Sequence, residues 1–412
     1  MGIIAMKQCR FCKNTLKQEF VDLVKAPPSN SFLRLEDLST PEVYYPLKLY
    51  VCERCLLVQI DEYKAAREIF DNNYVYFSSF SKTWLEHAKA YVELVSSRFK
   101  LVKGSKVVEV ASNDGYLLQY FKERGLEPLG IEPTKSTADV AIKKGISTIV
   151  EFFGETFGRQ LAATRGKADL IIANNVLAHV PDVNDFVGGF KALLAPNGVV
   201  TVEFPHLLKL VNLRQFDTIY HEHFSYYSLL TICKIFEAHE LRVFDVEELP
   251  THGGSLRIYV DHGSQHPISK SVENLLDVER RAGMESLSFY QGFQQAADSL
   301  KNDFLSFTLD AAKKGKSVAA YGAAAKGNTF LNYCGIKKDL LQCVADASPH
   351  KQGRYLPGSH IPVISESELR QMKPDYVVVL AWNLWPEITA QLSYIKEWGG
   401  KFVRAIPNLE IN

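Results

Sequence analysis

The stretch 217–227, Asp-Thr-Ile-Tyr-His-Glu-His-Phe-Ser-Tyr-Tyr, is the densest cluster of groups that can transfer protons. Histidine titrates near neutral pH, so His223 is suited to general acid–base catalysis, and Glu222 or Tyr220 are placed to orient it. The His-Glu-His spacing supplies no third metal ligand and is not the H-E-x-x-H of a zinc protease. We therefore predict an acid–base site in this stretch.

Another histidine, His179, follows directly after the predicted strand 169–175. In a methyltransferase sheet, this edge is where the substrate meets the methyl donor. The position suits a histidine packed in the core equally well, and the sequence leaves both interpretations open.

Four of the seven cysteines form two Cys-x-x-Cys turns. Two such turns complete a four-sulfur structural zinc site, which leaves no open position for water. The chain has no export signal, so the pattern favours metal over disulfides and a cytoplasmic protein. The predicted zinc ligands are Cys9, Cys12, Cys52 and Cys55, and the predicted free thiols are Cys233, Cys334 and Cys343.

The stretch 109–115, Glu-Val-Ala-Ser-Asn-Asp-Gly, is a glycine-poor form of the E-x-G-x-G-x-G turn that binds S-adenosylmethionine. Such a turn lets the cofactor's amino-acid end lie against bare backbone at a helix N-terminus. Glu132 ends the next predicted strand, where a carboxylate can accept both ribose hydroxyls. A nicotinamide site would need the full G-x-G-x-x-G. The predicted cofactor-binding residues are Ser112, Asn113, Asp114, Gly115, Glu132, Pro133, Phe153 and Asn174.

A glycine-bounded turn also follows the predicted strand 317–321, from Gly322 to Gly327. It lacks Gly-Lys-[Ser/Thr] and so is no P-loop, but it opens a helix whose N-terminus suits a phosphate. Lys351 and Arg354 lie on the next loop and can bracket a diphosphate. The alternative is a tightly packed turn with solvated cations. The predicted nucleotide-binding residues are Gly322, Lys326, Asn328, Asp346, Lys351 and Arg354.

The elements that must position these residues form an α/β pattern. The predicted strands 106–110, 128–133, 152–153, 169–175 and 198–203 alternate with helices, which indicates a doubly wound, mostly parallel sheet. A helix within 67–100 precedes them, one or two long helices span 270–312, and a second series has strands at 317–321, 341–346 and 376–380. We therefore predict a small zinc-binding module (1–66), a Rossmann-like methyltransferase domain (67–248) and a second Rossmann-like α/β domain (249–412).

Length and charge agree with several domains and a small-molecule substrate. A chain of 412 residues is too long for one ordinary core. Its 47 Lys and Arg balance 47 Asp and Glu, so there is no bulk attraction to nucleic acid or to an anionic membrane. No apolar run approaches the roughly 20 residues of a membrane span. We expect neither a nucleic acid nor a membrane as partner.

Together, these motifs resemble the zinc-containing C-methyltransferases of deoxysugar biosynthesis, which methylate a carbon of a nucleotide-linked ketosugar. The resemblance covers essentially the whole chain and is most similar to C-3 methyltransferases of 4-keto-6-deoxyhexoses. One departure is Ala111, where many relatives carry Gly. Besides the paired cysteine turns, the motifs are Y-V-Y-F-S-S-F-S (74–81), E-V-A-S-N-D-G-Y-L-L (109–118), Y-H-E-H-F-S-Y (220–226), H-G-G-S-L-R (252–257) and Y-G-A-A-A-K-G-N (321–328).

The resemblance implies that His223 is the base, with Tyr220 and Glu222 beside it. Tyr74 and His179 match further active-site positions, and the C-terminal sheet holds the nucleotide sugar. Tyr76 lies in the same loop as Tyr74; a packed linker is the alternative for this loop, and which of the two tyrosines faces the substrate stays open. The expected reaction removes a proton α to the ketone and then transfers the methyl group to that carbon. An O- or N-methyltransferase on a related sugar and a non-catalytic scaffold remain alternatives. The nucleotide, the sugar, the carbon and the oligomeric state stay open.

Overall fold

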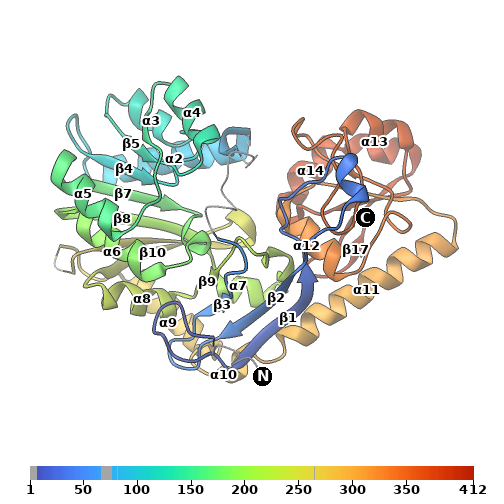
Figure 1. Cartoon of the computed structure of the whole chain (residues 1–412), viewed down its shortest axis with the longest axis horizontal. Coiled ribbons are helices and arrows are strands. Elements are labelled where there is room, and N and C mark those ends of the chain that lie inside the picture. The colour runs from blue at the N-terminus through green and yellow to red at the C-terminus, as the bar shows by residue number, and fades with distance from the viewer. Residues whose placement is uncertain (1–6, 66–76, 81, 264) are drawn as a thin grey trace.

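The computed structural model describes residues 7–65, 77–80, 82–263 and 265–412, so Tyr74 and Tyr76 lie outside the described residues. Three sheets organise the described residues: one near the N-terminus, one central and one C-terminal (Figure 1). Within the same ranges, no helix combines the length and apolar character needed to cross a membrane.

The central sheet contains seven strands in the described part of the chain, in the order β10-β11-β8-β7-β4-β5-β6. The five strands from β4 to β8 run parallel, and β10 and β11 are antiparallel additions at one edge. The predicted doubly wound α/β sheet is thereby confirmed. The strands are β4 (Val107–Val110), β5 (Leu129–Ile131), β6 (Ser147–Ile149), β7 (Ala168–Asn174), β8 (Leu194–Pro205), β10 (Arg242–Leu249) and β11 (Ser255–Asp261).

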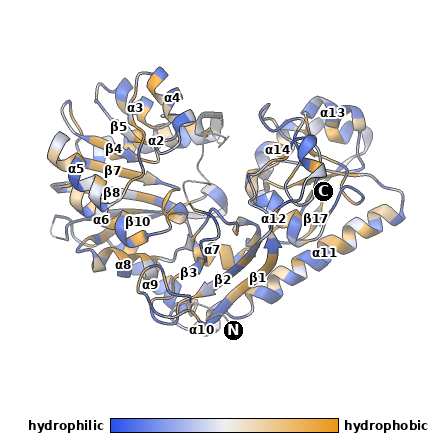
Figure 2. Ribbon diagram, viewed as in Figure 1, coloured by the Kyte–Doolittle hydropathy of each residue, from blue (hydrophilic) through white to orange (hydrophobic). Residues whose placement is uncertain are grey.

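Alternate residues of these strands face opposite layers of helices, as the two-residue period of a strand requires. Val107, Leu170 and Ile172 pack with α2, α3 and α4, whereas Val108 and Ile171 pack with α5, α6 and α8. Figure 2 shows the central strands as largely hydrophobic between these layers. The helices are α2 (Lys82–Arg98), α3 (Leu118–Glu123), α4 (Lys135–Lys143), α5 (Glu155–Arg165), α6 (Val183–Leu193), α7 (Leu207–Asn212) and α8 (Leu229–Ala238).

The third strand of the central sheet differs from its predicted place at 152–153. It is β6, whose residues pair in parallel with β5, while Phe152 and Phe153 lie in the loop before α5. The Phe153 ring packs 5.5 Å from the rings of both Phe186 and Phe190 on α6. The aromatic pair therefore marks a helix-packing contact and not a strand.

The central sheet extends beyond the predicted boundary at residue 248. β11 lies beyond it, yet β11 pairs with both β8 and β10 inside the central sheet. All seven of its residues are buried. The central sheet therefore continues to the end of β11.

The N-terminal sheet is antiparallel and draws its last strand from the middle of the chain. β9 pairs with β3, and the amide of Ile60 donates to the carbonyl of Phe224. The stretch that contains His223 is thus built into the zinc-binding module. The strands are β1 (Gln18–Ala26), β2 (Tyr45–Val51), β3 (Val58–Ile60) and β9 (Ser225–Tyr226).

The C-terminal sheet has the order β14-β13-β12-β15-β16-β17 and is parallel except for β17. β1 and α11 run together along the base of the molecule, and Phe20 stacks on Phe293 at 4.7 Å (Figure 1). The remaining elements are α9 (Lys270–Arg281), α10 (Leu287–Tyr290), α11 (Phe293–Lys313), β12 (Val318–Tyr321), α12 (Ala325–Tyr333), β13 (Val344–Ala345), β14 (Val363–Ile364), α13 (Glu366–Met372), β15 (Tyr376–Val379), α14 (Trp385–Gln391), β16 (Lys401–Arg404) and β17 (Glu410–Ile411).

Candidate active site

The four predicted cysteine ligands converge at the N-terminal sheet, with all Sγ atoms within 4.8 Å of one another. The Cys9–Cys55 and Cys12–Cys52 sulfur pairs are each 3.5 Å apart. Four sulfurs bound tetrahedrally to zinc lie roughly 3.8 Å apart, so the cluster fits this ion. Gln59 Nε2 donates to Cys9 Sγ at 3.3 Å, as expected around a thiolate ligand. The predicted zinc site is confirmed, and its four-sulfur shell makes it structural.

The predicted cofactor turn follows β4 and is held by the carboxylate of Glu132. Glu132 accepts hydrogen bonds from the amides of Asn113 and Thr134, both at 2.8 Å. Burial raises the pKa of Glu132, and these two amides oppose that shift. Gly115 has a φ of 74°, and a Cβ there would lie 2.4 Å from Ile146 Cδ1, so this position needs glycine.

Several polar atoms around this turn lack a hydrogen-bond partner among the described residues. They are buried side-chain atoms of Glu109, Ser112, Asp114 and Asn174, at the carboxyl ends of β4 and β7. Each such atom costs about 1–3 kcal/mol unless something pairs with it. A polar ligand at this edge of the sheet, such as the amino-acid and ribose parts of S-adenosylmethionine, would supply partners. Pro133, half-buried, follows Glu132 directly, whereas Phe153 has the contacts of a core residue.

His223 is held in one tautomer by its two neighbours. Its Nδ1–H donates to the carbonyl oxygen of Thr218 at 3.0 Å, and Tyr220 Oη donates to its Nε2 at 2.7 Å. The ring of His179 lies 4.6 Å from the ring of His223, nearly edge-on. Burial and the neighbouring His179 hold the pKa of His223 well below its usual value, and burial lowers the pKa of His179 to about 4. The structure thus brings His179, Tyr220 and His223 together, with both imidazoles neutral.

Glu222, which the sequence placed beside His223 to orient it, instead binds Asn30. Both carboxylate oxygens accept from Asn30 Nδ2, at 2.9 and 2.8 Å. A tight turn explains the difference: the amide of His223 donates to the carbonyl of Tyr220, which brings these two residues together and sends Glu222 elsewhere. Burial raises the pKa of Glu222 to about 7. The groups that orient His223 are Tyr220 and the backbone of Thr218.

His221 lies away from this pair, as its position in the turn requires. Its Nε2 donates to the carbonyl oxygen of Pro46 at 3.2 Å, and its ring packs edge-on against Tyr45 and Tyr63. These contacts belong to the N-terminal sheet and make His221 a packed histidine.

Lys326 faces the histidine cluster formed by His179, Tyr220 and His223, and does not face Lys351. Its Nζ donates to Asn383 Oδ1 at 2.9 Å and lies 5.0 Å from the centre of the Trp382 ring. Trp382 Nε1 donates to Asp217 Oδ2 at 2.7 Å. Burial lowers the pKa of Lys326, and burial raises the pKa of Asp217 to about 6, although each charge opposes the shift of the other. Sequence reasoning missed this link because Asp217 and Lys326 lie in different parts of the chain.

The other predicted nucleotide-binding residues surround the start of α12. Asp346 Oδ2 accepts from the amide of Ala323 at 2.8 Å, and Lys351 Nζ donates to the carbonyl of the same residue at 2.9 Å. Asn328 is buried and donates to the carbonyl of Ser29 at 3.3 Å, so it joins α12 to the N-terminal module. The side chain of Arg354 makes no hydrogen bond or ion pair with the described residues and is available to a ligand.

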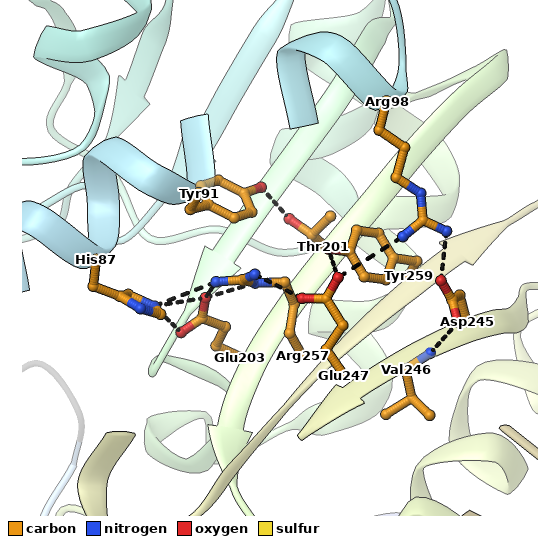
Figure 3. Close-up of polar contacts among 10 residues, drawn as sticks. All are labelled: His87, Tyr91, Arg98, Thr201, Glu203, Asp245, Val246, Glu247, Arg257 and Tyr259. Carbon is orange, nitrogen blue, oxygen red and sulfur yellow. Dashed lines mark hydrogen bonds and ion pairs between the residues drawn. The ribbon is translucent and has the colours of Figure 1, made fainter. Parts of the chain in front are cut away.

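A buried charge network, which the sequence did not reveal, supports the edge of the central sheet near these groups (Figure 3). Glu203 on β8 accepts from Arg257 Nε at 2.8 Å and contacts His87 Nε2 at 3.0 Å. Arg257 also binds Glu247 at 2.9 Å. Burial alone would raise the pKa of Glu203, but His87 and the charge of Arg257 bring it below its usual value.

Three family models match successive parts of this chain. They describe a zinc binding domain over residues 9–70, a methyltransferase domain over 84–246 and a C-methyltransferase C-terminal domain over 250–407. The C-methyltransferase NovU of Streptomyces niveus is 34% identical over 401 residues, which cover 97% of this chain and 95% of that relative.

Two further matches cover less of the chain. A ubiquinone biosynthesis O-methyltransferase of Actinobacillus pleuropneumoniae serotype 7 (strain AP76) is 33% identical over 106 residues, or 24% of this chain and 44% of that relative. The crystal structure of magnesium protoporphyrin IX methyltransferase (ChlM) from Synechocystis PCC 6803 with bound SAM matches 47% of this chain and 88% of its own. That match has 15% identity and a TM-score of 0.34.

Proposed function

Because this chain belongs to the family of zinc-binding, S-adenosylmethionine-dependent C-methyltransferases, we propose that its substrate is a nucleotide-linked keto-deoxysugar. In this proposal the methylated carbon is C-3 of a 4-keto-6-deoxyhexose. The observation that carries it is the geometry of His223, a neutral, oriented imidazole beside a tyrosine hydroxyl.

His223 is the base. Because Nδ1 donates to Thr218, the nitrogen that can accept a proton is Nε2. In the absence of substrate, the Tyr220 hydroxyl donates a hydrogen bond to the lone pair of Nε2. When the ketosugar binds, the Tyr220 hydroxyl turns to the carbonyl oxygen and frees Nε2. The α C–H bond then breaks, its proton goes to Nε2 and its electron pair forms the enolate.

The enolate oxygen needs donors, and the site offers Tyr220 and His179. Both His179 and His223 start neutral, so a proton taken up by His223 leaves a cation next to the new anion. S-adenosylmethionine supplies the electrophilic methyl group. Alignment of the enolate carbon with that group contributes much of the acceleration, of the order of 7–11 kcal/mol.

The cofactor site in this proposal is the turn after β4. The remaining lone pairs of the Glu132 carboxylate accept the ribose hydroxyls, because its other lone pairs already accept from Asn113 and Thr134. The unpaired atoms of Ser112, Asp114 and Asn174 lie toward the amino-acid end. In this proposal the methyl donor lies at the carboxyl edge of the sheet, beside the loop of His179.

The nucleotide lies at the N-terminus of α12, where Lys351 and the side chain of Arg354 are positioned for a diphosphate. Lys326, at the same helix end, faces the histidine cluster and so reaches the sugar end of the substrate. A substrate that spans from Arg354 to His223 has a negative diphosphate at one end and a ketosugar at the other.

Product analysis tests the proposal. The protein is incubated with S-adenosylmethionine carrying a ¹³C-methyl group and a panel of nucleotide-linked ketosugars, and the products are examined by NMR. A C-methyl signal on a quaternary carbon supports the proposal, and a methoxy or N-methyl signal refutes it. If no member of the panel is methylated, and neither S-adenosylmethionine nor any nucleotide-linked ketosugar raises the Tm of the protein, the chain is a scaffold and not a sugar methyltransferase.

A further inference from the structure

Three consecutive residues with positive φ precede β11: His252 (55°), Gly253 (88°) and Gly254 (115°). Glycine adopts such angles freely, but a histidine in this region is strained. Strained residues persist only where the surroundings enforce them, and they concentrate at functional sites. The H-G-G-S-L-R motif to which this turn belongs has no role in the function proposed above.

The two glycines of the turn lie against side chains of other elements. A Cβ at Gly253 would lie 2.4 Å from Trp382 Cη2, and one at Gly254 would lie 2.7 Å from Lys209 Cγ. The carbonyl of Gly253 accepts from Gln215 Nε2 at 2.8 Å. The two glycines let the backbone approach these side chains closely, and Nε2 of the neighbouring His252 is buried.

The ring of His252 lies between the two predicted ligand sites. It packs 5.2 Å from Trp84, whose ring lies 5.9 Å from Tyr116, the residue after Gly115 of the cofactor turn. The next residue, Gly253, lies against Trp382, over which Lys326 Nζ lies. His252 is close enough to His223 that its charge would lower the pKa of that residue.

His252 also has a ring nitrogen with nothing to bind. Its Nε2 is buried and has no hydrogen-bond partner among the described residues. Burial and the charge of Lys326 lower the pKa of His252 to about 4, so the ring is neutral at pH 7. A neutral imidazole keeps one N–H group, and this group can donate a hydrogen bond to a carbonyl oxygen.

The buried charge network supports Trp84, the side chain against which the His252 ring packs. His87 stacks on Trp84 at 4.8 Å. His87 is itself bound by Glu203, the partner of Arg257 on β11 (Figure 3). The same network therefore anchors both Trp84 and the strand that follows the turn. This rigidity suits a group whose direction matters.

We propose that His252 is a further catalytic residue, whose Nε2–H donates to the substrate oxygen that gains negative charge when His223 removes the α-proton. The proposal rests on the function proposed above. His252 transfers no proton in this step: the C–H proton goes to His223, and the electron pair goes to the enolate that His252 and Tyr220 stabilise.

Two variants separate the donor from the packing. His252→Asn accepts positive φ readily but shortens the side chain, and His252→Phe keeps a ring against Trp84 but has no N–H. His262→Asn is the matched control, because His262 follows the opposite end of β11. Its Nε2 donates to the carbonyl of Leu194. Exchange of the substrate's α-proton into D₂O and methyl transfer are measured on full-length protein, with affinity for S-adenosylmethionine as a check on folding.

Both His252 variants are expected to lose about 10²–10³-fold in exchange and in methyl transfer alike, with the affinity for S-adenosylmethionine unchanged. Added imidazole restores part of the exchange in His252→Asn, and the control stays at the wild-type rate. Wild-type exchange in either variant overturns the proposal, as does a loss of methyl transfer alone, which would make His252 a donor-positioning residue. If the wild-type protein itself neither exchanges nor methylates any ketosugar, the proposed function fails and this proposal with it.

Discussion

Arg10 donates from Nη1 to the carbonyl oxygen of Pro181 at 2.8 Å, a contact between residues 171 positions apart. Arg10 lies between two zinc ligands, and Pro181 lies two residues after His179. The same guanidinium donates to the carbonyl of Ile60 at 2.5 Å and rests 4.8 Å from the ring of Phe224, the neighbour of His223. The zinc-bound turn therefore holds both loops that carry the histidine cluster.

We predict that the zinc-binding turn supports turnover, because its residue Arg10 holds the loops of the histidine cluster in place. Arg10→Met should keep one equivalent of zinc yet lose stability by about 1.5–3 kcal/mol, because a half-buried charged donor is removed. Turnover should fall as the histidine loops loosen. Arg54→Met, at an exposed position of the second cysteine turn, is the control and should change neither quantity. Elemental analysis, thermal unfolding and methyl transfer check these outcomes, and unchanged stability and turnover in Arg10→Met would contradict the coupling.

Glu132→Ala should weaken the binding of S-adenosylmethionine by about 1.5–3 kcal/mol, because a charged acceptor of the ribose hydroxyls is lost. Glu127→Ala, on the exposed loop before β5, should bind normally. Calorimetry measures both affinities. An unchanged affinity in Glu132→Ala would move the cofactor to another part of the sheet.

In the proposed function, Lys351 binds the diphosphate and Lys326 the sugar end of the substrate, so substitutions of these two lysines should cause different defects. Lys351→Ala should weaken the binding of the free nucleoside diphosphate, because it removes a cation from the diphosphate site. Lys326→Ala should impair binding of the whole nucleotide sugar, yet leave the free nucleotide and S-adenosylmethionine less affected. Lys338→Ala, at an exposed position, is the control. Equal loss of all ligands in Lys326→Ala would indicate a folding defect, and no loss in either lysine variant would refute the site.

Glu222 predicts a pH dependence of stability. Its pKa is raised from 4.5 to about 7, so the folded protein holds a proton that the unfolded chain releases. The contribution of this group to stability is complete below pH 4.5 and is lost as the pH rises toward 7, with a slope of about 1.4 kcal/mol per pH unit at most. Relative to wild type, Glu222→Gln should therefore gain stability over this window. Thermal unfolding at several pH values checks this, and a pH-independent difference would contradict the assignment.

The sequence predicted the parts of the site that depend on local pattern. The two Cys-x-x-Cys turns, the acid at the end of β5 and the Tyr220–His223 cluster are all short-range signals, and the structure brings their members together. The placement of Glu222 failed because a turn, and not an extended chain, sets the direction of its side chain. Neither periodicity nor spacing could show that Asn30 would reach it.

Long-range pairing explains the other differences. The sequence predicts a last domain over residues 249–412 because it does not show which sheet a strand beyond residue 248 joins. The pairing of β11 with β8 and β10 decides this. The glycine-bounded turn predicts a phosphate near Lys326, and this stays a prediction. The contact of Lys326 with Asn383 arises within the C-terminal domain, whereas its proximity to Asp217 comes from the packing of this domain against the central one.

The central claim is that His223 removes the substrate's α-proton, and exchange of that proton tests it most directly. The substrate is incubated in D₂O with wild-type protein or with His223→Asn, and loss of the α-proton signal is followed by NMR. His221→Asn is the control, because that ring binds Pro46 and lies outside the cluster.

Wild-type protein and His221→Asn should exchange the proton. His223→Asn should bind both ligands normally, show no detectable exchange and lose on the order of 10²–10⁴ in turnover. Exchange and turnover near the wild-type rate in His223→Asn, with both lost on substitution of Tyr220 or His179, would contradict the account and move the base to that residue.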